Sequence, residues 1–412
     1  MPFTYVNGVL TCHGVRLEDI ASAVGTPVYV YSAQDILRRY QEYREGLAGL
    51  PHEICYAVKA NSNLSVLRLL AQAGSGFDIV SGGELFRVLR AGGDPRKVVF
   101  SGVGKTEAEL QYALECGIHS FNCESEAEAE LLDCIAGRLK RKARIALRVN
   151  PDVDASTHPY ISTGLREHKF GVDAADIPRV YQACLRMPNL LPESISCHIG
   201  SQLLDPQPLL EALDRMLELI SELRAAGVPI RRLDLGGGLG IAYRPEERPP
   251  AIGEVARALR RRLQGQELEL VLEPGRSIVG DAGVLITRVL YRKTTNAKHF
   301  VVVDAAMNDL IRPALYLSHH EIIPLEQAPE GKSILADVVG PVCETGDFLA
   351  RNRELADVAP GALLAVLAAG AYGFVQSSNY NSRPRAAEVM ISDGRWRIIR
   401  QRETYEDLIR GE

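Results

Sequence analysis

Eight short β-rich runs alternate with amphipathic segments between about residues 36 and 280, and this alternation constrains the fold more than any other feature. The segments between the runs, such as 208–227, place Leu and Ile at helical spacing and often end in Gly. Eight strands, each followed by a helix, predict a (β/α)8 barrel, because a Rossmann sheet normally uses fewer strands. The runs are ICYAVK (54–59), FDIV (77–80), KVVF (97–100), HSFN (119–122), RIALRV (144–149), SISCHI (194–199), RLDL (232–235) and LELVLE (268–273).

The pattern changes after residue 280, where strand-like runs follow one another with few helical segments between them. These runs are VLITRVLYRK, HFVVVDA, ALLAVLAA, AEVMIS and RWRIIR. A further strand-like piece, PVYVYS (27–32), is expected to pack on them. The sequence therefore predicts an α/β protein with two domains: the barrel, residues 36–280, and a mainly β domain formed by residues 1–35 and 281–412.

Composition narrows the classes of partner. The formal net charge of -5 and the pI of about 6.1 leave no basic surface for a phosphate backbone, so a small-molecule substrate is expected and nucleic acid is not. The N-terminus does not resemble a signal peptide and no apolar run approaches membrane-spanning length, so we expect a cytoplasmic protein without membrane contact. The eight cysteines form no CxxC pair and no zinc-like spacing, which predicts neither disulfides nor a metal site.

Polar residues fall at the predicted C-terminal ends of the barrel strands, where barrel enzymes place their active groups. They are Lys59, Asp78, His198, Gly236–Gly238 and Glu273. Each has a plain structural interpretation when taken alone: a solvated lysine, a core histidine, a tight turn, a partner for an arginine. Their expected meeting at one barrel mouth favours a functional interpretation.

These groups also suit one chemistry. A lysine amine buried in the barrel mouth is more easily deprotonated and can attack an aldehyde. Backbone N–H groups of a glycine turn can approach a phosphate. An imidazole can stack on a flat heterocycle, and a carboxylate can keep a pyridine nitrogen protonated so that the ring accepts electrons.

Seven ordered strings carry a family resemblance across nearly the whole chain. They are YAVKAN (56–61), CHIGSQ (197–202), LDLGGGLGI (233–241), LEPGRSIVG (272–280), DAAMNDLIRPALY (304–316), GPVCETGD (340–347) and AGAYGF (369–374). In this order they resemble the diaminopimelate decarboxylases, which are fold-type III, or alanine-racemase-like, enzymes that use pyridoxal 5'-phosphate (PLP).

The resemblance implies roles for the matching residues. Lys59 would attach PLP through a Schiff base, His198 would stack on its ring, and Glu273 would pair with the pyridinium nitrogen. The implied cofactor-binding set is Lys59, His198, Ser201, Gly236, Gly237, Gly238, Glu273, Pro274, Gly275, Arg276 and Tyr372. The implied substrate contacts are Arg276, Arg312, Tyr316, Glu344 and Tyr372, and the implied catalytic residues are Lys59, His198 and Cys343, with Cys343 as proton donor. The family is usually a homodimer in which the Cys343–Glu344 segment completes the partner's site.

The implied reaction is decarboxylation of meso-2,6-diaminopimelate to L-lysine, the last step of lysine biosynthesis. Arg276, Arg312 and Glu344 offer the mixed charges that the distal end of this substrate needs, whereas ornithine-type enzymes typically carry Cys-Asp at 343–344. An ornithine or arginine decarboxylase, a decarboxylase of a carrier-bound amino acid, an alanine racemase and a non-catalytic PLP-homeostasis protein are the alternatives, but homeostasis proteins are typically a lone barrel.

Three features of the chain stay open at this point. Thr345 stands where the family pattern has Ser, which is a conservative change. Arg166 and His168 fall in a stretch, 162–171, that we expect to form a flexible loop over the site. Asp78 could position His198, contact the cofactor or serve the structure alone.

Overall fold

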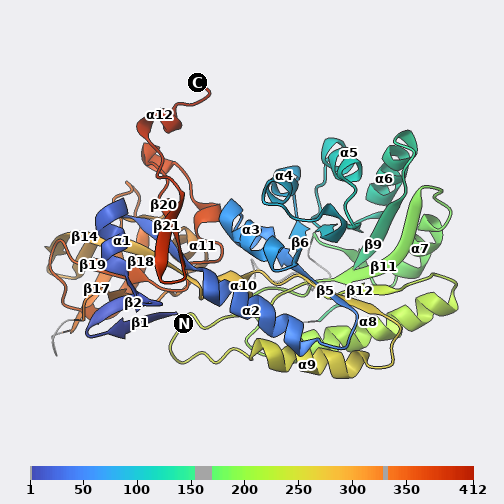
Figure 1. Cartoon of the computed structure of the whole chain (residues 1–412), viewed down its shortest axis with the longest axis horizontal. Helices are drawn as coiled ribbons and strands as arrows, with labels where there is room; N and C mark the ends of the chain where they lie inside the picture. The colour runs from blue at the N-terminus through green and yellow to red at the C-terminus, as the bar shows by residue number, and fades with distance from the viewer. Residues whose placement is uncertain (1, 154–168, 328–332) are drawn as a thin grey trace. The chain divides into compact units, whose positions relative to one another are not determined.

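The computed structural model describes residues 2–153, 169–327 and 333–412 of the chain (Figure 1). The chain forms two compact units, which we call the β unit and the barrel unit. The β unit comprises Met1–Arg38, Ile241–Glu247 and Ile278–Glu412, and the barrel unit comprises Arg39–Gly240 and Arg248–Ser277. Within the described residues, no helix combines the length and the apolar character needed to cross a bilayer.

Eight parallel strands close into a ring in the barrel unit, which confirms the predicted (β/α)8 barrel. Their order is β9-β11-β12-β13-β5-β6-β7-β8, and β8 pairs with β9 to close the ring, while the short β10 (Val172–Asp173) lies beside β9. All eight predicted runs are strands: β5 (His52–Ala57), β6 (Gly76–Ile79), β7 (Val98–Phe100), β8 (Ser120–Cys123), β9 (Ala143–Asn150), β11 (Leu190–Cys197), β12 (Arg232–Asp234) and β13 (Glu269–Leu272).

Helices follow the strands of the ring, and most of them bury apolar residues on one side, such as Leu85 and Val88 of α4. Figure 1 shows α4, α5 and α6 on one side of the strands and α8 and α9 on the other. Several of these helices begin at a capping side chain close to the preceding strand end, such as Ser81 for α4 and the Thr106–Glu109 capping box for α5. They are α3 (Leu64–Gln72), α4 (Gly82–Arg90), α5 (Glu107–Cys116), α6 (Glu126–Arg138), α7 (Ile177–Cys184), α8 (Gln207–Ala225), α9 (Ile252–Leu263) and α10 (Arg276–Val279).

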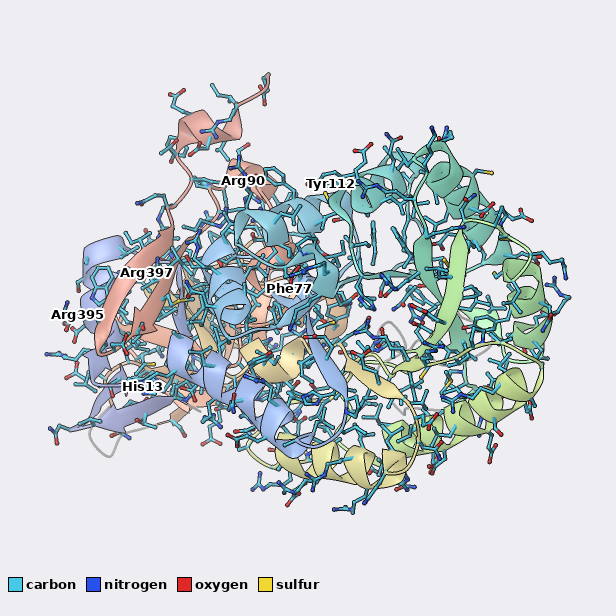
Figure 2. The ribbon with its side chains drawn as sticks, turned by 45° about the vertical axis from the view of Figure 1, so that its right-hand side comes forward. His13, Phe77, Arg90, Tyr112, Arg395 and Arg397 are labelled. Carbon is cyan, nitrogen blue, oxygen red and sulfur yellow. The ribbon has the colours of Figure 1, made fainter. Side chains whose placement is uncertain are left out.

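Aromatic side chains fill much of the barrel wall. Phe77 on β6, labelled in Figure 2, is fully buried and meets the ring of Tyr56 edge-on at 6.5 Å. Phe100 and Phe121 lie on neighbouring strands with ring centroids 6.3 Å apart. This packing fixes the strands against one another, so that the polar residues beyond their C-terminal ends have a rigid support.

A second sheet, of order β18-β17-β15-β14-β4-β20-β21, organises the β unit. The strand predicted at 27–32 is β4 (Val28–Ser32), which pairs with β14 and β20 as expected. The other strands are β14 (Gly283–Thr294), β15 (His299–Val303), β16 (Ile322–Pro324), β17 (Ser333–Val339), β18 (Phe348–Ala356), β19 (Leu363–Val366), β20 (Ala387–Ser392) and β21 (Arg395–Arg400). Three short N-terminal strands, β1 (Phe3–Val6), β2 (Val9–Cys12) and β3 (Val15–Arg16), form a separate small sheet.

The sequence patterns missed β17 and β18. Strand β18 lies at an edge of the sheet, and its middle residues Arg351, Asn352 and Glu354 do not face a core. Charged residues at an edge hinder pairing with another chain, but they also hide the strand from a search for apolar alternation. The opposite edge strand, β21, shows the same device with Arg395 and Arg397, both exposed (Figure 2).

The remaining helices of the β unit are short or lie outside the sheet. They are α1 (Leu17–Val24), α2 (Ala33–Gly46, which continues into the barrel unit), α11 (Arg312–Tyr316) and α12 (Tyr405–Leu408). Helix α1 buries Leu17, Ile20 and Ala21 in a core that also contains Val28 and Val30 of β4.

A buried carboxylate, Glu388 on β20, makes a testable contribution to this sheet. It accepts hydrogen bonds from the Tyr31 hydroxyl at 2.8 Å and from the Arg400 guanidinium at 2.5 Å. Tyr31→Phe removes one donor from a buried charged acceptor and should lower the free energy of unfolding by about 1.5–3 kcal/mol. Urea unfolding measures the change; the control Tyr291→Phe, at an exposed position, should change it little, and equal effects of both variants would contradict the assignment.

Candidate functional site

The predicted site lysine lies just beyond a barrel strand rather than at its end. Strand β5 stops at Ala57, and Lys59 occupies a single 3-10 turn, η1 (Val58–Ala60). The turn begins where the Ala57 N–H donates to the carbonyl of Pro274 at 3.0 Å, beyond the end of β13. The strand therefore ends two residues before the end of the predicted run, and Lys59 follows it in this turn.

The amine of Lys59 forms an ion pair with the Asp78 carboxylate on β6. About a third of the Lys59 side chain is exposed (37%), whereas Asp78 is completely buried. The amine is therefore only partly buried, and a buried charge holds it in place. The second carboxylate oxygen of Asp78 is buried and has no hydrogen-bond partner among the described residues.

A second carboxyl group near Lys59, Glu84, was missed by the sequence analysis. It lies in the first turn of α4 and accepts a hydrogen bond from the N–H of Val80 at 2.7 Å. Burial raises the pKa of Glu84 to about 7, and the Lys59 charge opposes the shift. The string SGGEL contained a signal, since Ser followed three residues later by Glu marks a helix start next to a strand end.

The glycine turn after β12 packs against two other predicted residues. A Cβ at Gly236, whose φ is +66°, would lie 2.6 Å from His198 Nδ1, and a Cβ at Gly237 would lie 2.2 Å from the carbonyl oxygen of Glu273. A Cβ at Gly238 would meet the Gly200 carbonyl at 2.5 Å. The three glycines are therefore required by close backbone approach, because no Cβ could be accommodated in the turn.

His198 follows the last residue of β11 and is partly buried. The N–H of Gly237 donates to its Nδ1 at 3.3 Å. Burial holds the pKa of His198 well below its usual range, and the charges of Arg148 and Lys59 lower it further. The imidazole is consequently neutral at pH 7, a form suited to stacking on a flat ring.

Glu273, one residue beyond β13, belongs to a buried polar cluster. Its Oε1 accepts from the Ser101 hydroxyl at 3.2 Å and from the Asn122 amide at 3.4 Å. The carboxyl group of Asp234, at the end of β12, is hydrogen-bonded to it. Burial raises the pKa of Glu273 well above its usual range, and the neighbouring charges of Asp234 and Asp78 raise it further.

Residues 274–276 continue from Glu273 around the same rim. Arg276 is buried and donates to the Ser201 hydroxyl at 3.0 Å. A Cβ at Gly275 would lie 2.9 Å from the Cβ of Ala60, next to Lys59. The structure thus brings together the predicted residues of the barrel unit: Lys59, His198, Ser201, Gly236, Gly237, Gly238, Glu273, Pro274, Gly275 and Arg276.

Two predicted substrate residues lie together in the β unit, at either end of α11. The guanidinium of Arg312 is 4.9 Å from the ring centre of Tyr243 and 5.9 Å from that of Tyr316. It also donates to His320 Nε2 at 3.3 Å and to the Ser318 hydroxyl at 3.3 Å. These contacts fix a buried cation in one orientation.

Cys343 and Glu344 are both exposed on the surface of the chain. The N–H of Cys343 donates to Asn381 Oδ1 at 2.8 Å, and the Tyr380 hydroxyl donates to Glu344 Oε2 at 2.8 Å. Thr345, which follows, is exposed as well. The segment is ordered by its own unit yet presents its thiol and carboxylate outward.

Two further predictions concern Tyr372, which the structure describes, and the pair Arg166 and His168, which it does not. Tyr372 lies in the β unit with a positive φ of 55°, an uncommon conformation for a tyrosine that often marks a functional turn. Arg166 and His168 lie outside the described residues. Across the described ranges, no group of three or more His, Cys, Asp or Glu side chains could hold a metal ion.

The barrel mouth fits PLP on three observations. The glycine turn brings backbone to the mouth without any Cβ, so a phosphate could approach it closely. A neutral imidazole adjoins this turn, and an amine capable of a Schiff base is held by a buried carboxylate with an unpartnered oxygen. Phosphate, ring and aldehyde each have a matching group.

Comparisons with known proteins also indicate a PLP-binding enzyme. A family model described as "Pyridoxal-dependent decarboxylase, pyridoxal binding domain" matches residues 33–280. A diaminopimelate decarboxylase from Pseudomonas aeruginosa is 55% identical, with 100% of this chain and 98% of the relative covered. One from Vibrio cholerae is 54% identical over 98% of this chain and 96% of the relative.

The chain belongs to the diaminopimelate decarboxylase family. Among solved structures, it is similar to the diaminopimelate decarboxylase from Helicobacter pylori complexed with L-lysine, with a TM-score of 0.92 and 43% identity. That match covers 96% of this chain and 98% of the other. The family resemblance and the PLP dependence expected from the sequence are both confirmed.

A diaminopimelate decarboxylase family member should lose cofactor when the glycine turn is filled. Gly237→Ala would force apart the turn and the backbone of Glu273, and such overpacking costs about 1–3 kcal/mol. We therefore expect PLP binding to weaken by about ten- to a hundredfold, as measured by titration of the apo-protein with PLP. Gly104→Ala, at an exposed glycine with nothing within 4 Å, is the control; equal affinity of the two variants would argue against a phosphate-binding turn.

Proposed function

We propose that this chain decarboxylates meso-2,6-diaminopimelate to L-lysine and CO2, using PLP held in the mouth of the barrel. The observation that best supports this proposal is the convergence of Lys59, His198, the glycine turn and Glu273 at one end of a single closed barrel. Relatives at up to 55% identity over the full length are named for this reaction. The reaction makes the chain a carboxy-lyase of lysine biosynthesis.

The residues that hold the cofactor divide by the part they bind. The glycine turn, Ser201 and the backbone of residues 273–276 would hold the phosphate, and His198 would cover one ring face. Lys59 would bond to the aldehyde carbon, with Asp78 orienting its amine. When bound, PLP supplies an electron-accepting ring that stabilises negative charge at the substrate's α-carbon.

The protein's own contribution is to place charges and protons. Glu273 would hold the ring nitrogen in its protonated state, and the neutral His198 adds no competing positive charge. Cys343 would deliver a proton from Sγ to the α-carbon after CO2 has left, and its exposed thiol is accessible for that purpose.

Recognition of the distal end of the substrate would fall to Arg312, Tyr316 and Glu344. Arg312 can pair with the distal carboxylate through its planar donor fork, and Glu344 with the distal ammonium. Arg276 would add a second positive charge to this set, and Tyr372 would lie against both cofactor and substrate. This mixture of charges favours diaminopimelate over ornithine, which lacks the distal carboxylate.

We further propose a cytoplasmic homodimer in which the Cys343–Glu344 segment completes the partner's site. The support is the outward presentation of both side chains, since a thiol and a carboxylate needed for catalysis are exposed on their own chain. Tyr380 and Asn381 hold this segment in a fixed shape before any partner is met.

Lysine formation and cofactor attachment should disappear together in Lys59→Ala. We expect the purified protein to show the visible absorption of lysine-bound PLP and to release lysine from meso-diaminopimelate, and the variant to show neither. Lys97→Ala, which removes a lysine paired with Glu53 before the start of β7, should keep both. A PLP band without lysine release would move the substrate to ornithine, arginine or a carrier-bound amino acid.

Mixing two inactive variants tests the shared site. Lys59→Ala and Cys343→Ala homodimers should each form almost no lysine, whereas co-expressed chains should recover up to about a quarter of normal activity, because half of the dimers then carry one intact site. Activity that stays at the level of the parents would show that each chain supplies its own thiol.

A further inference from the structure

The buried cluster around Glu273 contains a second carboxyl group to which no role has been assigned. Asp234 ends β12, is 3% exposed, and hydrogen-bonds through its carboxyl group to that of Glu273. Two buried carboxyl groups can share such a hydrogen bond only if one of them carries a proton. We propose that Asp234 is a positioning residue that shares one proton with Glu273, so that the pair carries a single negative charge both before and after PLP binds.

The contacts of Asp234 show how it could exchange charge with Glu273. Its Oδ1 accepts from the N–H of Gly236 at 2.8 Å, and its Oδ2 accepts from the Asn122 amide at 3.0 Å. The same amide nitrogen lies 3.4 Å from Glu273 Oε1 and 3.1 Å from the Ser101 hydroxyl. The Asn122 amide therefore lies within hydrogen-bond distance of both carboxyl groups, so it can donate to whichever of them carries the negative charge.

The proposed proton movement is internal to the pair. Without PLP, the proton lies on Glu273, and the charge of Asp234 is stabilised by Gly236 and Asn122. With PLP bound, the proton leaves a Glu273 oxygen for an Asp234 oxygen, which frees Glu273 as a carboxylate for the ring nitrogen. The ring nitrogen keeps its own proton, so no proton is gained or lost.

The surrounding charges favour a carboxyl pair that binds one proton over a pair in which both groups are ionised. Burial raises the pKa of both carboxyl groups, and the charge of Asp78 adds to the increase, while Lys59 opposes it at Glu273. Cys55 and Cys197 also face the pair, and burial raises the pKa of each thiol, so neither contributes charge at pH 7. Removing Asp234 takes away a repulsive charge and should let Glu273 ionise at lower pH.

Infrared difference spectra of the apo-protein at pH 7 test the proposal. Subtracting the spectrum of Asp234→Asn from that of the unmodified protein should reveal the carbonyl band of one protonated carboxyl group, which the variant has lost. Glu273→Gln should lose the same band. Difference spectra are needed because Glu84 and Asp309, whose pKa values burial raises to about 7, also contribute protonated carboxyl groups.

Ser101→Ala is the matched control, because it removes a hydrogen bond to Glu273 without removing a titrating group. It should keep the band. Asp234→Asn retains an oxygen for the N–H of Gly236, so the turn should persist; circular dichroism verifies the fold, and Glu273→Gln provides a second route if that variant does not fold. A band that survives in Asp234→Asn would overturn the proposal, because Glu273 would then be protonated by burial alone.

PLP-bound protein provides the second part of the test. When PLP saturates the unmodified protein, the band of one protonated carboxyl group should remain. Its frequency should shift, because the proton now lies on Asp234. Complete loss of the band on binding would overturn the proposed transfer. The proposal rests on the proposed placement of Glu273 at the ring nitrogen, but neither measurement uses substrate, so a failure to form lysine would not affect it.

Discussion

Closure of the parallel ring between β8 and β9 is the constraint on which the site depends. It places the C-terminal ends of all eight strands around one mouth, so that Asn122 on β8 reaches Asp234 at the end of β12 and Glu273 beyond β13. In an open sheet of the same order these strands would be far apart. The ring therefore converts residues more than a hundred positions apart into one polar cluster.

Closure also explains how so many charges can be buried there. Asp78, Asp234 and Glu273 would repel one another strongly in an apolar interior. The structure offsets the repulsion with the Lys59 amine and with neutral donors from Ser101 and Asn122. Placing an aldehyde on Lys59 and a pyridinium beside Glu273 would keep positive charge at both ends of this acidic cluster, which is a physical reason for its affinity for PLP.

Features that arise from interactions between neighbouring residues could be predicted from the sequence. Features that arise from contacts between distant segments could not. The eight barrel runs were found because each buries a local apolar stretch, whereas β18 was missed because Arg351, Asn352 and Glu354 make its edge look polar. The run of three glycines identified the turn, whereas Asp234, two residues earlier, was not recognised as a site residue. Asn122 ended a recognised run and still gave no signal, since an asparagine at a strand end is common and its partners are distant in the chain.

Local sequence patterns were enough to establish the alternation of strands and helices, the mainly β character after residue 280, the lysine, the glycine turn and the family to which these strings belong. These are properties of short segments, where side-chain periodicity and turn chemistry act over a few residues. The pairing of Lys59 with Asp78 and of Glu273 with Asp234 became visible only in the folded chain. Charge states in a buried cluster depend on distances between segments, and those distances exist only after the ring has closed.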